Sequence, residues 1–161
     1  GPPYTLDAAY SFVRGADVAF GFPDIVFEGE SAFAELLNRQ PSSGADVVLG
    51  LFPTVRPEIM DMVQLDRSGR VNDLVIRPAT TDLSLCWALA VWAPGFTEFL
   101  HDHLRTRVAS AASSPELSVG HVMQAAVRAV LLAGGVQVSD KPFHDIGTRV
   151  GLQNVLRSRG N

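Results

Sequence analysis

Apolar residues along the chain follow two patterns, short runs and a helical spacing of three to four residues. Runs that are continuously apolar, or that alternate with polar residues, predict β-strands. These strands are expected at residues 17–22, 46–52, 60–65, 71–76, 85–91 and 136–138. Apolar residues that share one helical face predict α-helices. These helices are expected at residues 6–13, with Thr5 as N-cap, and at 31–39, 96–108, 117–132 and 149–157.

The connections between these segments indicate the fold class. Residues 41–44 (Pro-Ser-Ser-Gly) are expected to form a loop, and Gly134-Gly135 to end a helix. Asp66-Arg67-Ser68-Gly69 joins two alternating strands as a hairpin turn. Elsewhere strands and helices alternate, which predicts a three-layer α/β domain with a mostly parallel sheet over residues 1–161. The strands at 17–22 and 47–52 are almost free of polar residues, so both are expected to be buried.

Composition and charge exclude some classes of partner. The net charge is −4 and the basic residues are scattered, which argues against nucleic-acid binding. The longest apolar stretch, residues 83–100, is interrupted by Pro94-Gly95 and Glu98, so no membrane span is expected. Cys86 is the single cysteine and lies in an apolar run. We therefore expect a buried thiol and a reducing, cytoplasmic location.

Two aspartates follow predicted strands. Asp24 closes Gly21-Phe22-Pro23-Asp24, directly after the strand at 17–22, and Asp145 opens Asp145-Ile146-Gly147-Thr148, before the last helix. Functional residues gather at strand ends in open α/β sheets. Each has a structural alternative, because Asp24 could cap a turn and Asp145 could cap a helix. If both carboxylates converge, they suit a hard cation such as Mg²⁺.

Arginine and histidine give two further candidates. Arg77-Pro78 ends the second hairpin strand, and its guanidinium could hold a sugar phosphate, although simple solvation is the alternative. His144 is adjacent to Asp145 and is the only one of the four histidines with a plausible place in a site.

In the order of these motifs, the sequence resembles the sugar-1-phosphate nucleotidylyltransferases, the family of glucose-1-phosphate thymidylyltransferase. The matching segments are residues 21–24, 44–50 and 63–71, Arg77-Pro78, residues 87–92 and Asp145-Ile146-Gly147-Thr148. The resemblance implies a Rossmann-like sheet of the nucleotide-diphospho-sugar transferase type with a β-hairpin insertion. It implies an enzyme that makes a nucleotide sugar and pyrophosphate from a nucleoside triphosphate and a sugar 1-phosphate.

The same resemblance assigns roles to particular residues. Asp24 and Asp145 would hold the catalytic Mg²⁺, and Arg77 would stand where the family has a lysine that approaches the sugar phosphate. Thr5 and Leu6 would lie near the base and the sugar. His144 is added as a substrate-binding candidate because it is adjacent to Asp145.

The sequence also departs from the family. The family's Gly-Gly-x-Gly-Thr-Arg loop, which grips the triphosphate, does not occur, and Asp61 stands where a glycine is expected. A first βαβ portion is therefore expected to be absent, and the chain alone to be inactive. Its buried strands would then be covered by a missing N-terminal segment or by another subunit in a homo-oligomer. The alternative is a non-catalytic domain that binds a nucleotide sugar or a partner protein.

Overall fold

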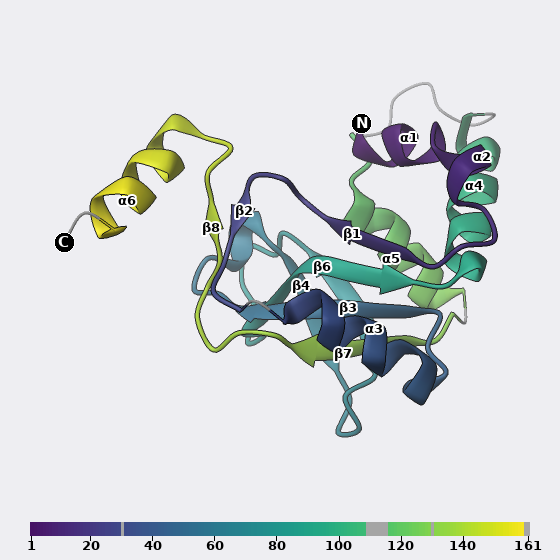
Figure 1. Ribbon diagram of the computed structural model, residues 1–161, viewed down its shortest axis with the longest axis horizontal. Coiled ribbons are helices and arrows are strands. Elements are labelled where there is room, and N and C mark those ends of the chain that lie inside the picture. The colour runs from purple at the N-terminus through teal and green to yellow at the C-terminus, as the bar shows by residue number, and fades with distance from the viewer. Residues whose placement is uncertain (30, 109–115, 130, 160–161) are drawn as a thin grey trace.

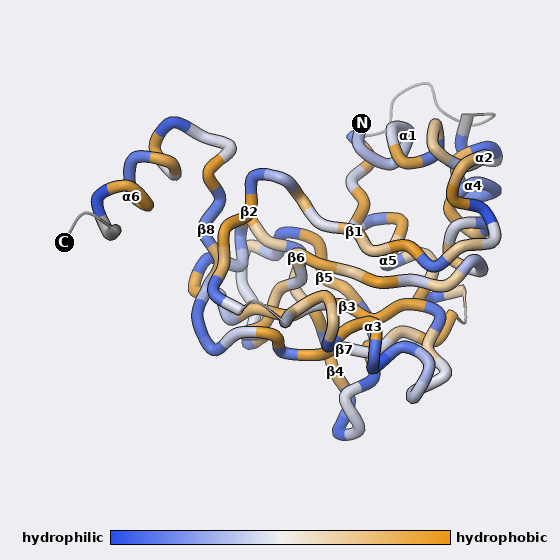
Figure 2. Tube along the Cα trace, in the orientation of Figure 1, coloured by the Kyte–Doolittle hydropathy of each residue, from blue (hydrophilic) through white to orange (hydrophobic). Residues whose placement is uncertain are grey.

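Two long apolar strands form the centre of the sheet. The computed structural model describes residues 1–161 except 30, 109–115, 130 and 160–161. Strand β3 (Val47–Pro53) pairs antiparallel with β6 (Leu85–Trp92), and all but one residue of each strand is buried. Both strands are mostly apolar in colour in Figure 2. Of the two strands predicted to be buried, the one at 47–52 is confirmed as β3, and other parts of this chain cover it.

The sheet has six strands, but it is mixed and mainly antiparallel (Figure 1). The order is β5-β4-β6-β3-β7, and β1 pairs with β6 beside β4. The other strands are β1 (Val18–Gly21), β4 (Asp61–Leu65), β5 (Val71–Ile76) and β7 (Ala133–Gln137). Among the described pairings of this sheet, only β3 with β7 is parallel. The predicted mostly parallel sheet is therefore wrong, because a strand covered on both faces has the same apolar pattern in either direction.

Apolar clusters on both faces of the sheet make the fold three-layered. On one face α3 (Ala32–Ser43) packs its Leu36 against Val48 and Leu89. On the other face Phe96 and Met123 join the cluster that holds Trp87. These two side chains come from α4 (Pro94–Val108) and α5 (Val119–Arg128). These layers bear out the α/β expectation.

The predicted hairpin is present as β4 and β5, and its turn reaches β7. Asp66 Oδ1 accepts hydrogen bonds from the N–H groups of Ser68 (2.7 Å) and Arg70 (3.0 Å). Gly69 has the positive φ of 83° that such turns require. Its carbonyl accepts a hydrogen bond from the Gly135 N–H at 3.0 Å.

The glycine pair at 134–135 lies inside β7 and does not end a helix, which corrects the prediction. Helix α5 ends at Arg128. A Cβ on Gly135 would lie 2.7 Å from Leu51 Cδ1 and 2.9 Å from Leu65 Cδ2. The glycine is therefore required for close packing of the hairpin and β3 against this strand.

The predicted loop at 41–44 is also wrong, because α3 continues through Pro41 to Ser43. Two serine hydroxyls donate to carbonyls at this end of the helix: Ser42 to Arg39 (2.9 Å) and Ser43 to Gln40 (3.2 Å). Gly44 then ends the helix in the left-handed conformation, at φ 64°. The helix therefore accommodates a proline that usually marks its end.

The N-terminal helix differs from its prediction as well. It is divided into α1 (Pro2–Asp7) and α2 (Tyr10–Val13), and Thr5 lies inside α1 where it caps nothing. The proline at the start of α1 explains the earlier beginning, since proline suits the first helical turn.

Strand β1 is an edge strand, and the expectation of a buried strand here is wrong. Its residues alternate between half-buried and exposed, and β6 is its only partner among the described residues. The short apolar run was sufficient to predict a strand but not the number of its neighbours.

Three short elements and the last helix complete the fold. Strands β2 (Ile25–Val26) and β8 (His144–Asp145) pair antiparallel, and a 3₁₀ turn covers Pro57–Ile59. Helix α6 (Arg149–Arg159) follows β8 and lies apart from the sheet in Figure 1. None of the described helices has the length and apolarity that a membrane crossing requires.

Cys86 is fully buried in β6, as expected. Burial raises the pKa of its thiol to about 12. A thiol that stays protonated is a poor nucleophile, so Cys86 serves packing.

Candidate functional site

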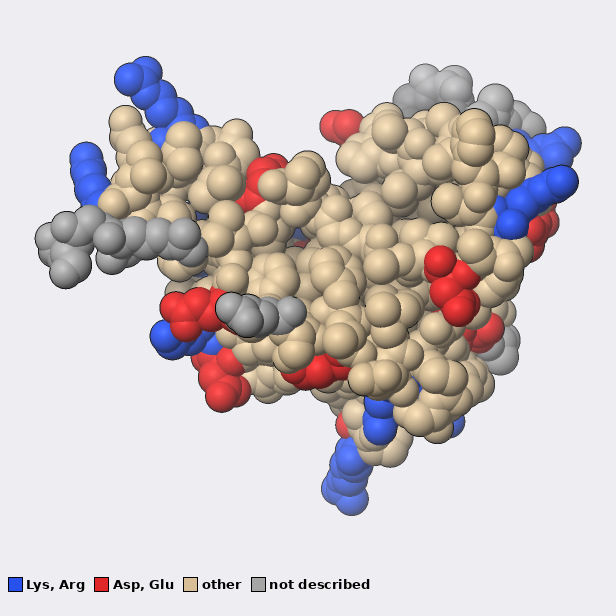
Figure 3. All heavy atoms as spheres, in the orientation of Figure 1, with Lys and Arg blue, Asp and Glu red and all other residues tan. Residues whose placement is uncertain are grey.

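The short β2–β8 ladder brings the two predicted aspartates together. Ile25 pairs with Asp145, and the Ile146 N–H donates to the Asp24 carbonyl at 2.8 Å. The two motifs are more than a hundred residues apart in the sequence, yet they form adjacent strands of one ladder. Figure 3 shows a hollow between the part of the molecule that carries α6 and the part that carries α1 and α2.

The carboxylates of Asp24 and Asp145 meet over the α-carbon of Gly147. A Cβ on Gly147 would overlap Asp24 Oδ2 and would lie 3.2 Å from Asp145 Oδ1. The Gly147 N–H donates to the same Asp145 oxygen at 2.8 Å. Only a residue without a side chain leaves this space to the two carboxylates. Within the described residues, no third His, Cys, Asp or Glu joins them in a metal-ligand cluster.

The alternative role of Asp145 as a helix cap is not supported. Thr148 is the residue that caps α6, since its Oγ1 accepts a hydrogen bond from the Gly151 N–H at 3.0 Å. Asp145 instead closes a tight turn onto Gly147 and is exposed to solvent. One of its carboxylate oxygens is thus held in place by the backbone beside Asp24.

Arg77 shares a cavity with Asp145. This cavity, about 220 Å³ in volume, is lined by Phe22, Ile25, Ile59, Met60, Asp61, Arg77, Trp87, Ala88, Phe143 and Asp145. Arg77 has φ 45°, which makes it the one non-glycine residue with positive φ among those described. Strained backbone of this kind is concentrated at functional sites. Arg77 is therefore a stronger candidate for a functional residue than its sequence context alone indicates.

Two of the residues that line this cavity each have a buried polar atom that lacks a hydrogen-bond partner among the described residues. These atoms are Asp61 Oδ1 and the indole Nε1 of Trp87, a residue that is only 5% exposed. The nearest cation to Asp61 is Arg77, whose Nε lies 4.0 Å from Oδ1. Sequence reasoning did not assign either residue to a site. The sequence offered one signal for Asp61: it is a carboxylate at the start of a strand, at a position where a glycine is expected.

The remaining predicted residues line neighbouring cavities. Thr5 and Leu6 face a cavity of about 480 Å³ between α1 and the end of β1, where Phe22 also contributes. Phe22 lines the Arg77 cavity as well, so the two cavities adjoin at this residue. His144 lines a third cavity with Lys141 and Glu28, whose side chains form an ion pair at 2.8 Å. It does not line the cavity of Asp145, because successive strand residues point to opposite faces.

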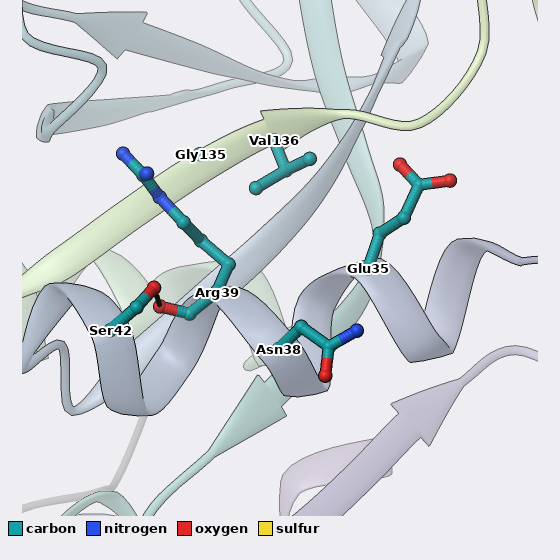
Figure 4. Close-up of a pocket in the computed structure, with 6 residues that line it drawn as sticks. All are labelled: Glu35, Asn38, Arg39, Ser42, Gly135 and Val136. Atoms are coloured by element: carbon teal, nitrogen blue, oxygen red, sulfur yellow. Dashed lines mark hydrogen bonds between the residues drawn. The ribbon is translucent and has the colours of Figure 1, made fainter.

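A larger groove of about 540 Å³ lies between α3 and β7 (Figure 4). Figure 4 shows that Glu35, Asn38, Arg39 and Ser42 come from α3, while Gly135 and Val136 come from β7. None of the predicted site residues lines it, and it holds neither of the unpartnered buried polar atoms. The smaller cavity at Asp61 is therefore the better candidate for an active site.

Positively charged side chains are scattered over the face of the molecule drawn in Figure 3. Figure 3 shows lysine and arginine side chains at separate places on the periphery, with no basic stripe on this face.

Burial raises the pKa of the Asp61 carboxyl above its ordinary value of 3.8, while the positive charges of Arg77 and His121 oppose this shift. A raised pKa in the folded state favours the protonated carboxyl, so stability is lost as the pH rises through the folded pKa. We therefore expect Asp61→Asn to be more stable than the parent chain at neutral pH, by about 1 kcal/mol.

The difference between Asp61→Asn and the parent should shrink toward pH 3.8, where the parent carboxyl becomes protonated even in the unfolded chain. Thermal melts of both proteins across the acid range measure this. A constant difference at all pH values would contradict the assignment of the effect to Asp61 ionisation.

Two solved structures resemble this chain over nearly its whole length. One is described as a glucose-1-phosphate thymidylyltransferase from Bacillus anthracis in complex with a sucrose, with TM-score 0.76 and 13% identity. The other is a UTP-bound UGPase from Acinetobacter baumannii, with TM-score 0.71 and 17% identity. Each covers 98% of this chain, and the chain spans 60% and 56% of the two solved chains, respectively.

These likenesses show the fold, which is of the sugar-1-phosphate nucleotidylyltransferase type. The expected α/β architecture around a central sheet is confirmed at that level. Searches with family models and against curated protein sequences find no match.

Proposed function

We propose that this chain is the part of a sugar-1-phosphate nucleotidylyltransferase that binds metal and sugar phosphate. The observation that carries the proposal is the meeting of Asp24 and Asp145 over Gly147, beside a cavity that also contains Arg77. The fold type and the neighbouring structures' sugar and UTP ligands support it.

The donor set suits a hard cation. Two carboxylates at one point, one half-buried and one exposed, leave room for the water ligands that Mg²⁺ retains. Asp24 and Asp145 would hold this ion. Mg²⁺, when bound, neutralises negative charge on phosphate oxygens.

In the proposed reaction, a sugar 1-phosphate oxygen attacks the α-phosphate of a nucleoside triphosphate in line, and pyrophosphate leaves. The role of the protein is positioning and electrostatic stabilisation. The Arg77 side chain lines the cavity and is 63% exposed, and its guanidinium would hold the attacking phosphate with paired N–H donors. The adjoining apolar cavity of Thr5 and Leu6 would hold the base and ribose.

We expect the 161-residue polypeptide to bind glucose 1-phosphate in the presence of Mg²⁺ but to release no pyrophosphate from UTP or dTTP. The reason is that its sequence contains no Gly-rich loop to grip the triphosphate. Calorimetry measures the binding, and a coupled pyrophosphate assay measures turnover. Robust turnover would show that the loop is not needed, and absence of Mg²⁺-dependent binding would remove the proposed function.

A second candidate is a binding domain without catalysis, which recognises a nucleotide sugar or a partner protein. The replacement of the family lysine by Arg77 favours it. Such a domain should bind UDP-glucose equally well with and without Mg²⁺. A strong dependence on Mg²⁺ favours the enzyme.

A further inference from the structure

The cavity beside Asp145 contains an excess of negative charge. Its charged lining residues are Asp61, Asp145 and Arg77. Asp145 points toward the proposed metal position with Asp24, so Arg77 is the cation left to balance Asp61 and any phosphate in the cavity. One guanidinium cannot neutralise both the Asp61 carboxylate and a bound phosphate.

Asp61 is held in place by packing and not by hydrogen bonds to its Oδ1. Its Oδ2 lies against Gly120 in the first turn of α5, where a Cβ would overlap it. Its Oδ1 is buried and accepts no hydrogen bond from a described residue. A buried carboxylate oxygen without a donor costs free energy, so the Asp61 carboxylate is incompletely stabilised in the unliganded chain.

Arg77 does not satisfy this oxygen in the unliganded chain. Its Nε is 4.0 Å from Asp61 Oδ1, beyond hydrogen-bond range, and its side chain is largely exposed. A phosphate bound by Arg77 would draw the guanidinium further from Asp61. The carboxylate then needs a positive donor from the ligand itself.

We propose that Asp61 is the specificity residue of this cavity, and that the cavity selects a sugar phosphate that carries an amino group. This inference rests on the proposed function. The phosphate contacts Arg77, and the ammonium donates to the part of the Asp61 carboxylate that is exposed to the cavity, since this side chain is 15% exposed. A charge-assisted hydrogen bond of this kind is about twice as strong as one from a neutral hydroxyl.

Calorimetric titration with glucosamine 1-phosphate and glucose 1-phosphate, both with Mg²⁺, tests the inference on three proteins. The parent chain is expected to bind the amino sugar phosphate about tenfold more tightly, and Asp61→Asn is expected to lose this preference. Asp82→Asn makes the same charge change at an exposed loop position outside the cavity and should keep it. Thermal melts establish that each variant is folded.

The outcomes separate the two proposals. Equal affinity for the two sugar phosphates in the parent chain, or a preference that survives in Asp61→Asn, overturns the role of Asp61 and leaves the proposed function intact. Failure of the parent chain to bind either compound overturns the proposed function and this inference with it.

Discussion

Replacing Gly120 with alanine is expected to lower the free energy of unfolding by about 2 kcal/mol, as overpacking of a filled site does. A Cβ at this position would overlap Asp61 Oδ2 and would lie 3.2 Å from Ile76 Cδ1. Gly120 is the second residue of α5, whose buried face packs on the sheet, so the helix cannot move away freely. Urea unfolding followed by the fluorescence of Trp87 and Trp92 measures the loss.

Gly95→Ala is the matched control for this prediction. Gly95 is the second residue of α4, as Gly120 is of α5, and the nearest atom to its Cβ position is Asp46 Oδ1 at 3.5 Å. That distance is an ordinary contact, so alanine should be neutral or slightly stabilising there. Equal destabilisation by both substitutions would mean that helix position, and not Asp61, is responsible.

A double substitution isolates the contact between Gly120 and Asp61. Asp61→Ala removes the carboxylate that the new Cβ would overlap, so Gly120→Ala should cost much less in that background. Residues in direct contact show such non-additivity, with coupling of about 0.5 to 3 kcal/mol. If the losses in unfolding free energy of the two single variants simply add, the new Cβ clashes mainly with Ile76 and not with Asp61.

The central strands could be predicted from the sequence because their signal is local. Continuous apolar runs identified β3 and β6, and the Gly69 turn identified the hairpin. Strand direction could not be predicted, because burial on both faces removes the alternation that distinguishes the two kinds of sheet. The glycine pair at 134–135 was misinterpreted for a similar reason, since its cause is close packing by Leu51 and Leu65 from distant segments.

The site was predictable in part. Asp24 and Asp145 were identified by their positions after strands and by the resemblance of their motifs, and the ladder that joins them has only two residues in each strand. Strands this short have no periodicity to detect. Asp61 could not be assigned, because its importance depends on Gly120, Arg77 and Trp87, which converge on it only in the folded chain.

Asp24→Asn and Asp145→Asn are each expected to weaken Mg²⁺ binding by about tenfold or more, a loss of about 1.4 kcal/mol of binding free energy. Each substitution replaces a charged oxygen ligand by a neutral amide at the point where the two carboxylates meet. Gly147→Ala should also weaken binding without changing the charge, because its Cβ would displace Asp24 Oδ2.

The measurement is the rise in melting temperature with Mg²⁺ concentration, since a ligand that binds only the folded chain stabilises it in proportion to its affinity. The parent chain and the exposed-loop variant Asp82→Asn should both respond, while the three site variants should respond only at much higher Mg²⁺. Melts without metal separate this effect from a loss of fold, because all five proteins should then unfold cooperatively. An unchanged Mg²⁺ response in both aspartate variants would place the ion elsewhere, and the carboxylate pair over Gly147 would need another explanation.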